Sequence, residues 1–183
     1  MDHNLSPSLA VRYVQETKIS LVIPNDPDLI PIVSSYLSSM IDPNGASCKP
    51  AWLELALDEA LNNAMYQGNL EMSSMEKTED FSRFYEIAES KRRAAPYAAR
   101  RIFVTFCYQG TTLSITVRDE GRGFNWRNHV EKTAEDPERP FGRGLAIIRK
   151  YASAMEYNPA GNELTLYFSG CHLAVGAPHN RAQ

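Results

Sequence analysis

Three short polar motifs, placed in a fixed order along the chain, constrain its fold more than any other feature. They are Glu59-Ala-Leu-Asn-Asn63-Ala64, Asp119-Glu-Gly121-Arg-Gly123-Phe124 and Gly142-Arg-Gly144-Leu145. The first lies in helix-like sequence, the second follows strand-like sequence, and the third opens another helix-like stretch. No G-x-x-x-x-G-K-[ST] motif occurs in the chain. A phosphate site would therefore have to be built without a P-loop.

Composition and charge narrow the class of protein. A chain of 183 residues, 43% hydrophobic and 22% charged, predicts one domain over residues 1–183. The 19 basic and 22 acidic residues give a net charge of −3, which argues against direct nucleic-acid binding. No stretch approaches the roughly 18 apolar residues of a membrane span, and no secretory signal is visible. We therefore expect a cytoplasmic protein without a membrane partner.

The three cysteines carry little information as a sequence pattern. Cys48, Cys107 and Cys171 are far apart, odd in number and without the spacing of a metal site. This usage predicts free, buried thiols in a reducing compartment.

The order of apolar patterns predicts an α+β fold. We expect a two-layer sandwich, in which a mostly antiparallel mixed sheet carries helices on one face. The expected elements are a strand over 11–23, helices over 28–40 and 50–67, a helical insertion over about 70–101, strands over 102–108 and 113–117, a loop over 123–140, a helix over 145–155, and strands over 164–168 and 172–175. On the helix at 28–40, the expected buried face consists of Leu29, Ile32, Val33, Tyr36 and Leu37.

The insertion has its own pattern. Phe81, Phe84, Tyr85 and Ala88 recur at the spacing of an amphipathic helix. Basic residues follow at Lys91, Arg92, Arg93, Arg100 and Arg101. We expect these to form a solvated helix end that interacts favourably with the helix dipole. A docking surface for a partner protein is the alternative.

The first motif places an acid and an amide on one helix face. Glu59 and Asn63 are four residues apart, so their side chains lie about one turn apart on the same side. The amide oxygen of Asn63 is a suitable hard ligand for Mg²⁺. Glu59 could accept a proton from a nucleophile that attacks a terminal phosphate. A solvent-facing pair on the helix is the alternative.

The two glycine motifs add a base site and an anion site. Asp119, at a strand end, could accept a hydrogen bond from an exocyclic amine such as that of adenine. Gly121 and Gly123 let the backbone approach a ligand closely. The backbone N–H groups at 142–145, at the start of a helix, favour an anion, to which Arg143 adds a cation. Taken singly, the Asp119 motif is explained equally well by a tight turn, and the Gly142 motif by the end of a loop. Taken jointly, the three motifs indicate a nucleotide site.

Taken together, the motifs resemble the N, G1 and G2 boxes of the GHKL ATPase superfamily, which has the Bergerat nucleotide-binding fold. They are most similar to those of the bacterial anti-sigma factor serine/threonine kinases. The resemblance covers most of the chain and ends on the strand Gly161-Asn162-Glu-Leu-Thr165-Leu. It implies ATP and Mg²⁺ as cofactors, with Asn63 as the metal ligand, Glu59 as the general base and Asp119 as the adenine-recognising residue. The residues implied at the phosphate lid are Gly121, Gly123, Gly142 and Gly144, with Arg143 and Leu145 on the helix that follows.

The resemblance also implies an activity and partners. A kinase of this type transfers phosphate to a serine or threonine of an antagonist (anti-anti-sigma, STAS-type) protein, regulates a sigma factor or similar partner, and forms a homodimer. The alternative is a non-catalytic, ATP-gated binding module. Gln67, where these kinases often carry histidine, and the long insertion give this alternative weight. Asn162 stands where histidine kinases often carry threonine. A histidine kinase fragment is a weaker interpretation, since no helix pair with a phospho-accepting histidine is evident.

Overall fold

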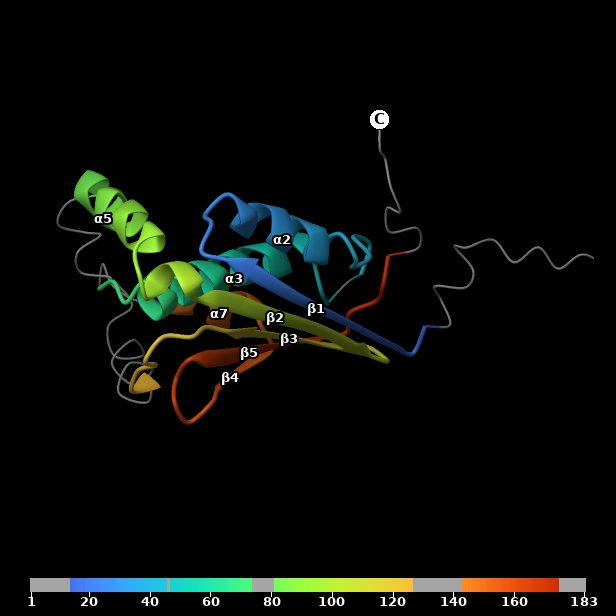
Figure 1. The fold of residues 1–183 in the computed structure, drawn as a ribbon. Coiled ribbons are helices and arrows are strands. Elements are labelled where there is room, and N and C mark those ends of the chain that lie inside the picture. Colours follow the sequence, from blue (N-terminus) through green and yellow to red (C-terminus); the bar gives the residue numbers. More distant parts are fainter. Residues whose placement is uncertain (1–13, 46, 74–80, 127–142, 175–183) are drawn as a thin grey trace, which may run out of the picture.

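One antiparallel sheet forms the base of the structure. The computed structural model describes residues 14–45, 47–73, 81–126 and 143–174. The strands are β1 (Glu16–Pro24), β2 (Arg101–Gln109), β3 (Thr112–Arg118), β4 (Ala154–Tyr157) and β5 (Glu163–Ser169). They lie in the order β1-β2-β3-β5-β4, and every pairing between them is antiparallel (Figure 1). The α+β prediction is confirmed, and the described sheet is antiparallel rather than mixed.

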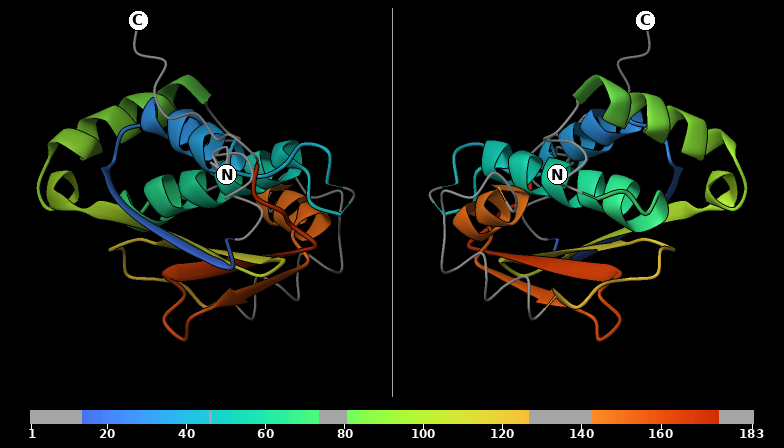
Figure 2. Two further views of the ribbon diagram at one scale, coloured as in Figure 1. Left: turned by 90° about the vertical axis from the view of Figure 1, so that its right-hand side faces the viewer. Right: turned by 90° about the vertical axis from the view of Figure 1, so that its left-hand side faces the viewer.

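The helices cover one face of this sheet. These are α2 (Leu29–Ser38), α3 (Pro50–Asn62) and α7 (Arg143–Tyr151), and Figure 2 shows all three on the same side. Every second residue of β2, β3 and β5 is buried toward them, which is the alternation expected of a sheet with one covered face. The helix α5 (Phe81–Arg93) lies at one end of the molecule and is joined to β2 by a short 3₁₀ turn, η2 (Tyr97–Ala99). Within the described ranges, no helix is long and apolar enough to cross a bilayer.

The last third of the chain differs from the predicted elements. The helix α7 ends at Tyr151, and Met155, which we predicted to be helical, lies in β4. The strand expected at 172–175 is reduced, over its described part, to one isolated bridge between Leu173 and Ile41. The strand β4 has only four residues and forms a sheet edge, so its apolar pattern is too short to distinguish from the end of a helix.

The buried face of α2 is rotated from the predicted one. Ile32 and Tyr36 are 60% and 49% exposed, while Ser34 and Ser38 are buried. Each buried serine donates its hydroxyl to a backbone carbonyl of its own helix, Ser34 to that of Ile30 and Ser38 to that of Ser35. Because these small side chains satisfy their polar groups locally, they can face the core in place of larger apolar residues.

The prediction of three free thiols is wrong for two of the cysteines. Cys48 and Cys171 form a disulfide, with their Cα atoms 4.9 Å apart, and Cys107 is free. The bond joins the loop before α3 to the residues after β5. The partners are 123 residues apart, and such a pairing follows from the topology and not from spacing.

Candidate nucleotide site

A cleft with a volume of about 280 Å³ lies between the helices and the sheet, beyond the end of β3. Val117, Leu164 and Tyr157, which are neighbours across β3, β5 and β4, form part of its lining. Of the residues selected from the sequence, Asn63, Asp119, Gly123 and Leu145 line this one cleft. With Tyr157 and Leu164 included, the lining comes from four chain segments that are distant in sequence.

Glu59 and Asn63 face the start of α7. A Cβ added at Gly144 would lie 2.5 Å from Oε2 of Glu59 and 3.5 Å from Nδ2 of Asn63. A side chain at position 144 would therefore collide with the acid of the first motif. Gly144 allows the first turn of α7 to approach both polar side chains, which brings the first and third motifs together.

The helix that carries these residues changes its winding at the site. After Asn62 the α-helix α3 continues as a π-helix, η1 (Asn63–Asn69). Such wide turns are rare and occur frequently at functional sites. Gln67 lies in this turn, and its Nε2 donates a hydrogen bond to Oδ1 of Asn63 at 3.2 Å. Gln67 therefore contacts the oxygen that we predicted as a metal ligand.

The oxygens present fit Mg²⁺ rather than a metal held wholly by protein. Within the described ranges, no three His, Cys, Asp or Glu side chains gather into a metal cage. Mg²⁺ is usually held by one or two protein groups, with water and substrate phosphates filling its remaining positions. The amide oxygen of Asn63 supplies one protein group of this kind.

Asp119 is a buried carboxylate that also lines the cleft. It is 8% exposed, and its Oδ1 accepts a hydrogen bond from the N–H of Gly121 at 2.8 Å. Burial raises the pKa of Asp119 to about 6, against the opposing effect of the Gly121 bond and the positive charge of Arg100. A Cβ added at Gly68 would lie 2.3 Å from Cγ of Asp119. The absence of a side chain at Gly68 therefore makes room for this carboxylate.

The turn after β3 is packed on both sides. A Cβ added at Gly121 would lie 2.3 Å from the carbonyl oxygen of Gly68. Gly123 has a φ of +71°, and a Cβ there would lie 2.0 Å from the carbonyl oxygen of Ala160, in the loop between β4 and β5. Both glycines are therefore required by close backbone approaches.

Two of the predicted residues are described in part or not at all. Gly142 lies outside the described residues, as does most of the loop expected at 123–140. Arg143 is described only as the first residue of α7.

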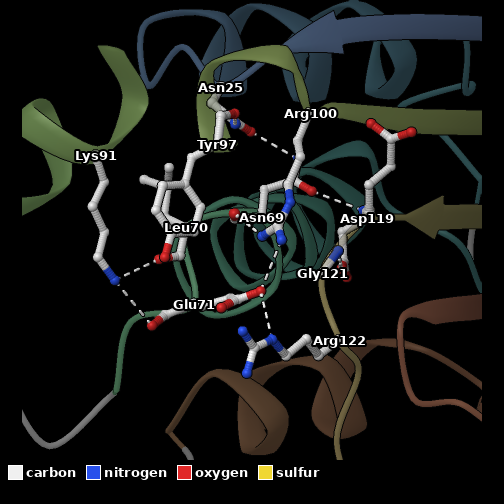
Figure 3. A network of polar contacts seen from close by, with 11 residues as sticks. Asn25, Asn69, Leu70, Glu71, Lys91, Tyr97, Arg100, Asp119, Gly121 and Arg122 are labelled. Atoms are coloured by element: carbon white, nitrogen blue, oxygen red, sulfur yellow. Dashed lines mark hydrogen bonds and ion pairs between the residues drawn. The ribbon is translucent and has the colours of Figure 1, made fainter. Parts of the chain in front are cut away.

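Asn69, which the sequence did not single out, joins three elements at the site (Figure 3). The side chain is fully buried, and its Oδ1 accepts a hydrogen bond from the N–H of Glu120 at 2.8 Å. Its Nδ2 donates to Oδ1 of Asn25 and to the carbonyl of Arg101. Asn69 thus fixes the residue next to Asp119 to the end of the π-helix and to the start of β2.

Two basic residues of the insertion, Lys91 and Arg100, bind the backbone carbonyls of residues 69–71, at the end of the π-helix. Nζ of Lys91 donates to the carbonyls of Leu70 and Glu71, at 2.8 and 3.2 Å. Arg100 donates to the carbonyl of Asn69 at 2.6 Å and pairs with the Glu71 carboxylate at 2.8 Å, and Arg122 lies 3.4 Å from the same carboxylate (Figure 3). The prediction of a solvated helix end is therefore wrong for Lys91 and Arg100.

The comparison with known families agrees with this geometry. A family model described as the histidine kinase-like ATPase domain matches residues 23–168, from the end of β1 to the end of β5. No curated protein matches the chain. The matched region contains the cleft, Glu59, Asn63, Asp119 and the glycines around them. The chain belongs to the histidine kinase-like ATPase family, which is of the GHKL type, and this membership supports ATP binding.

Proposed function

We propose that this protein is an ATP-dependent serine/threonine kinase of the anti-sigma factor type, which phosphorylates an antagonist protein. The observation that carries the proposal is the meeting of Glu59, Asn63 and Gly144 at the first turn of α7, with Asp119 buried elsewhere in the same cleft. An acid beside a candidate metal ligand at a helix N-terminus is suited to phosphoryl transfer.

Different residues of the chain would bind the adenine and the phosphates of the nucleotide. Asp119 would accept a hydrogen bond from the adenine amine. The phosphates would lie toward Gly144, where backbone N–H groups and the helix dipole favour negative charge. Asn63 would hold Mg²⁺, which neutralises charge on the β- and γ-phosphate oxygens when bound.

Glu59 would act as the general base. Its carboxylate takes the proton of a serine or threonine hydroxyl as the hydroxyl oxygen forms a bond to the γ-phosphorus. The bond from that phosphorus to the β–γ bridging oxygen breaks, and ADP leaves with the electron pair. Most of the rate enhancement comes from the positioning of the two reactants and from charge neutralisation.

The partners are part of the same proposal. The substrate would be a STAS-type antagonist, a sigma factor or similar regulator would be the second partner, and the protein would act as a homodimer. The similarity of the three motifs to those of anti-sigma factor kinases supports this assignment.

Transfer of label from γ-labelled ATP to a purified antagonist tests the activity. We expect the wild type to label the antagonist on serine or threonine, and Glu59→Gln to be about 100-fold slower or more while still binding ATP. Glu54→Gln is the matched control, because Glu54 lies on the same helix but contacts Ser38 on α2. Equal labelling by the wild type and Glu59→Gln would show that Glu59 is not the base.

A second candidate function is an ATP-gated switch that binds partners without transferring phosphate. The hydrogen bond from Gln67 to Asn63 favours it, since an amide without acid–base chemistry contacts the candidate metal ligand. ATP-dependent binding of a partner, with no label transferred by the wild type, would support the switch and exclude the kinase.

A further inference from the structure

Tyr157, the last residue of β4, is a polar side chain in the cleft for which the proposed mechanism has no role. It pairs with Leu164 of β5, which itself pairs with Val117 of β3, so all three side chains lie on the helix-facing side of the sheet. Asp119 follows Val117 by two residues and also lines the cleft. Two strand spacings, roughly 10 Å, separate the backbones of β3 and β4 at this level. Tyr157 and Asp119 therefore border the cleft from different strands.

The ring of Tyr157 is held in place by two aromatic neighbours. Trp126 stacks on it, with ring centroids 5.8 Å apart and an interplanar angle of 22°. Phe124 meets it edge-on, at 5.4 Å and 86°. Trp126 is in turn fixed by a hydrogen bond from its Nε1 to the carbonyl of Asn158. The position of the phenol is thus set before any ligand binds.

The hydroxyl of Tyr157 has no hydrogen-bond partner among the described residues. Tyr157 is half-buried and lines the cleft, so this hydroxyl can meet a ligand there. Burial, with a smaller contribution from the negative charge of Asp119, raises the pKa of Tyr157 to about 12. The hydroxyl therefore remains protonated at neutral pH and is available as a donor.

We propose that Tyr157 is a specificity-determining residue of the nucleotide site, whose hydroxyl donates a hydrogen bond to a ring nitrogen of adenine while Asp119 accepts one from the exocyclic amine. The proposal rests on the cleft being the ATP site and does not depend on kinase activity. Adenine offers ring nitrogens as acceptors and its amine as a donor, which is the complement of a phenol and a carboxylate. Guanine has a carbonyl oxygen in place of that amine. This oxygen would face the Asp119 carboxylate, and the two acceptors would repel each other.

Tyr157→Phe tests the proposal, because it removes the hydroxyl and keeps the ring between Trp126 and Phe124. We expect Mg-ATP to bind about fivefold to tenfold more weakly by titration calorimetry, as for the loss of one neutral hydrogen bond. The control is Tyr167→Phe, since Tyr167 lies on β5 with its hydroxyl on Glu156 and does not line the cleft. We expect the control to bind ATP as the wild type does. Wild-type affinity in Tyr157→Phe would overturn the proposal.

Deaza analogues of ATP, each with one ring nitrogen replaced by a C–H group, identify the contact from the ligand side. We expect one analogue to bind the wild type about fivefold more weakly than ATP, and to bind Tyr157→Phe as well as ATP does. Equal binding of every analogue and ATP to the wild type would refute the proposal, whether or not the variant folds. Failure of the wild type to bind ATP at all would instead refute the ATP site, and this inference with it.

Discussion

At the scale of single residues, Asp119 shows how binding and stability oppose each other at this site. The carboxylate is almost fully buried, and the raised pKa means that its ionised form is disfavoured in the folded protein. The N–H of Gly121 and the charge of Arg100 offset only part of that cost. The ionised carboxylate is nevertheless the stronger acceptor for an adenine amine. We infer that Asp119 contributes to ligand binding and not to the stability of the fold.

Asp119→Asn should therefore bind ATP about 10- to 100-fold more weakly and yet be at least as stable as the wild type at neutral pH. Because the pKa rises from 3.8 to about 6 on folding, the folded wild type binds more protons than the unfolded chain between these values. Its free energy of unfolding should fall, relative to that of the variant, as the pH rises from about 4 to about 6. ATP affinity of the wild type should rise as Asp119 ionises.

Calorimetric titrations and urea unfolding of both proteins across this pH range check the prediction. The phosphates of ATP titrate equally in both experiments, so the difference between wild type and variant isolates Asp119. Parallel pH profiles for the two proteins would contradict the role of the carboxylate.

At the scale of elements, the insertion helix α5 supports the segment that forms one wall of the cleft. Lys91 holds two carbonyls just beyond the π-helix, and the Phe84 ring packs against Tyr66 of that turn at 5.3 Å. Glu71, between these contacts, has a φ of +49°, a backbone conformation that non-glycine residues seldom adopt. Contacts from α5 and from Arg100 hold this conformation.

Lys91→Met should lower the free energy of unfolding by about 1–2 kcal/mol, since it leaves two half-buried carbonyls without their charged donor. ATP affinity should fall as well, because Gly68 and Met72 line the cleft on either side of these carbonyls. Arg93→Met is the control: this arginine is 75% exposed and pairs with Glu89 on its own helix, so we expect a change below about 0.5 kcal/mol. Chemical denaturation and ATP titration measure both quantities, and equal effects of the two substitutions would exclude a specific role for Lys91.

The same elements show what local sequence can and cannot predict. The helix of Glu59 and Asn63 and the hairpin before Asp119 follow from periodicity and turn residues, which act over a few positions. The hydrogen bond from the N–H of Glu120 to Asn69 spans 51 residues, and those from Lys91 span 21 and 20. Nothing in a short window distinguishes such a side chain from one in solvent, so Asn69 could not be identified from the sequence, and Lys91 was expected at a solvated helix end.

At the scale of the whole molecule, the order of elements as far as α7 was predictable, but β4 and the contacts made by the segment after β5 were not. Antiparallel hairpins and a single helical layer follow from alternating and amphipathic patterns. The C-terminal segment after β5 instead returns to the loop after α2. There the N–H of Asp42 donates to the carbonyl of His172, and the N–H of Ala174 donates to that of Met40. The disulfide between Cys48 and Cys171 lies in the same region, where the fold and not the sequence brings the two thiols together.

The disulfide should stabilise the whole fold without being needed by the ATP site. It closes a loop of more than a hundred residues, and removing such a link by Cys48→Ser with Cys171→Ser should lower the free energy of unfolding by about 2–4 kcal/mol. ATP affinity should stay within about twofold of the wild type, because the backbone bonds at Asp42 and Ala174 still hold the segment.

Denaturation with and without a reductant, compared with Cys107→Ser, measures the effect, since Cys107 is free. If the double variant and the reduced wild type unfold like the oxidised protein, the disulfide contributes no stability. If removal of the disulfide abolishes ATP binding, the segment after β5 supports the cleft directly.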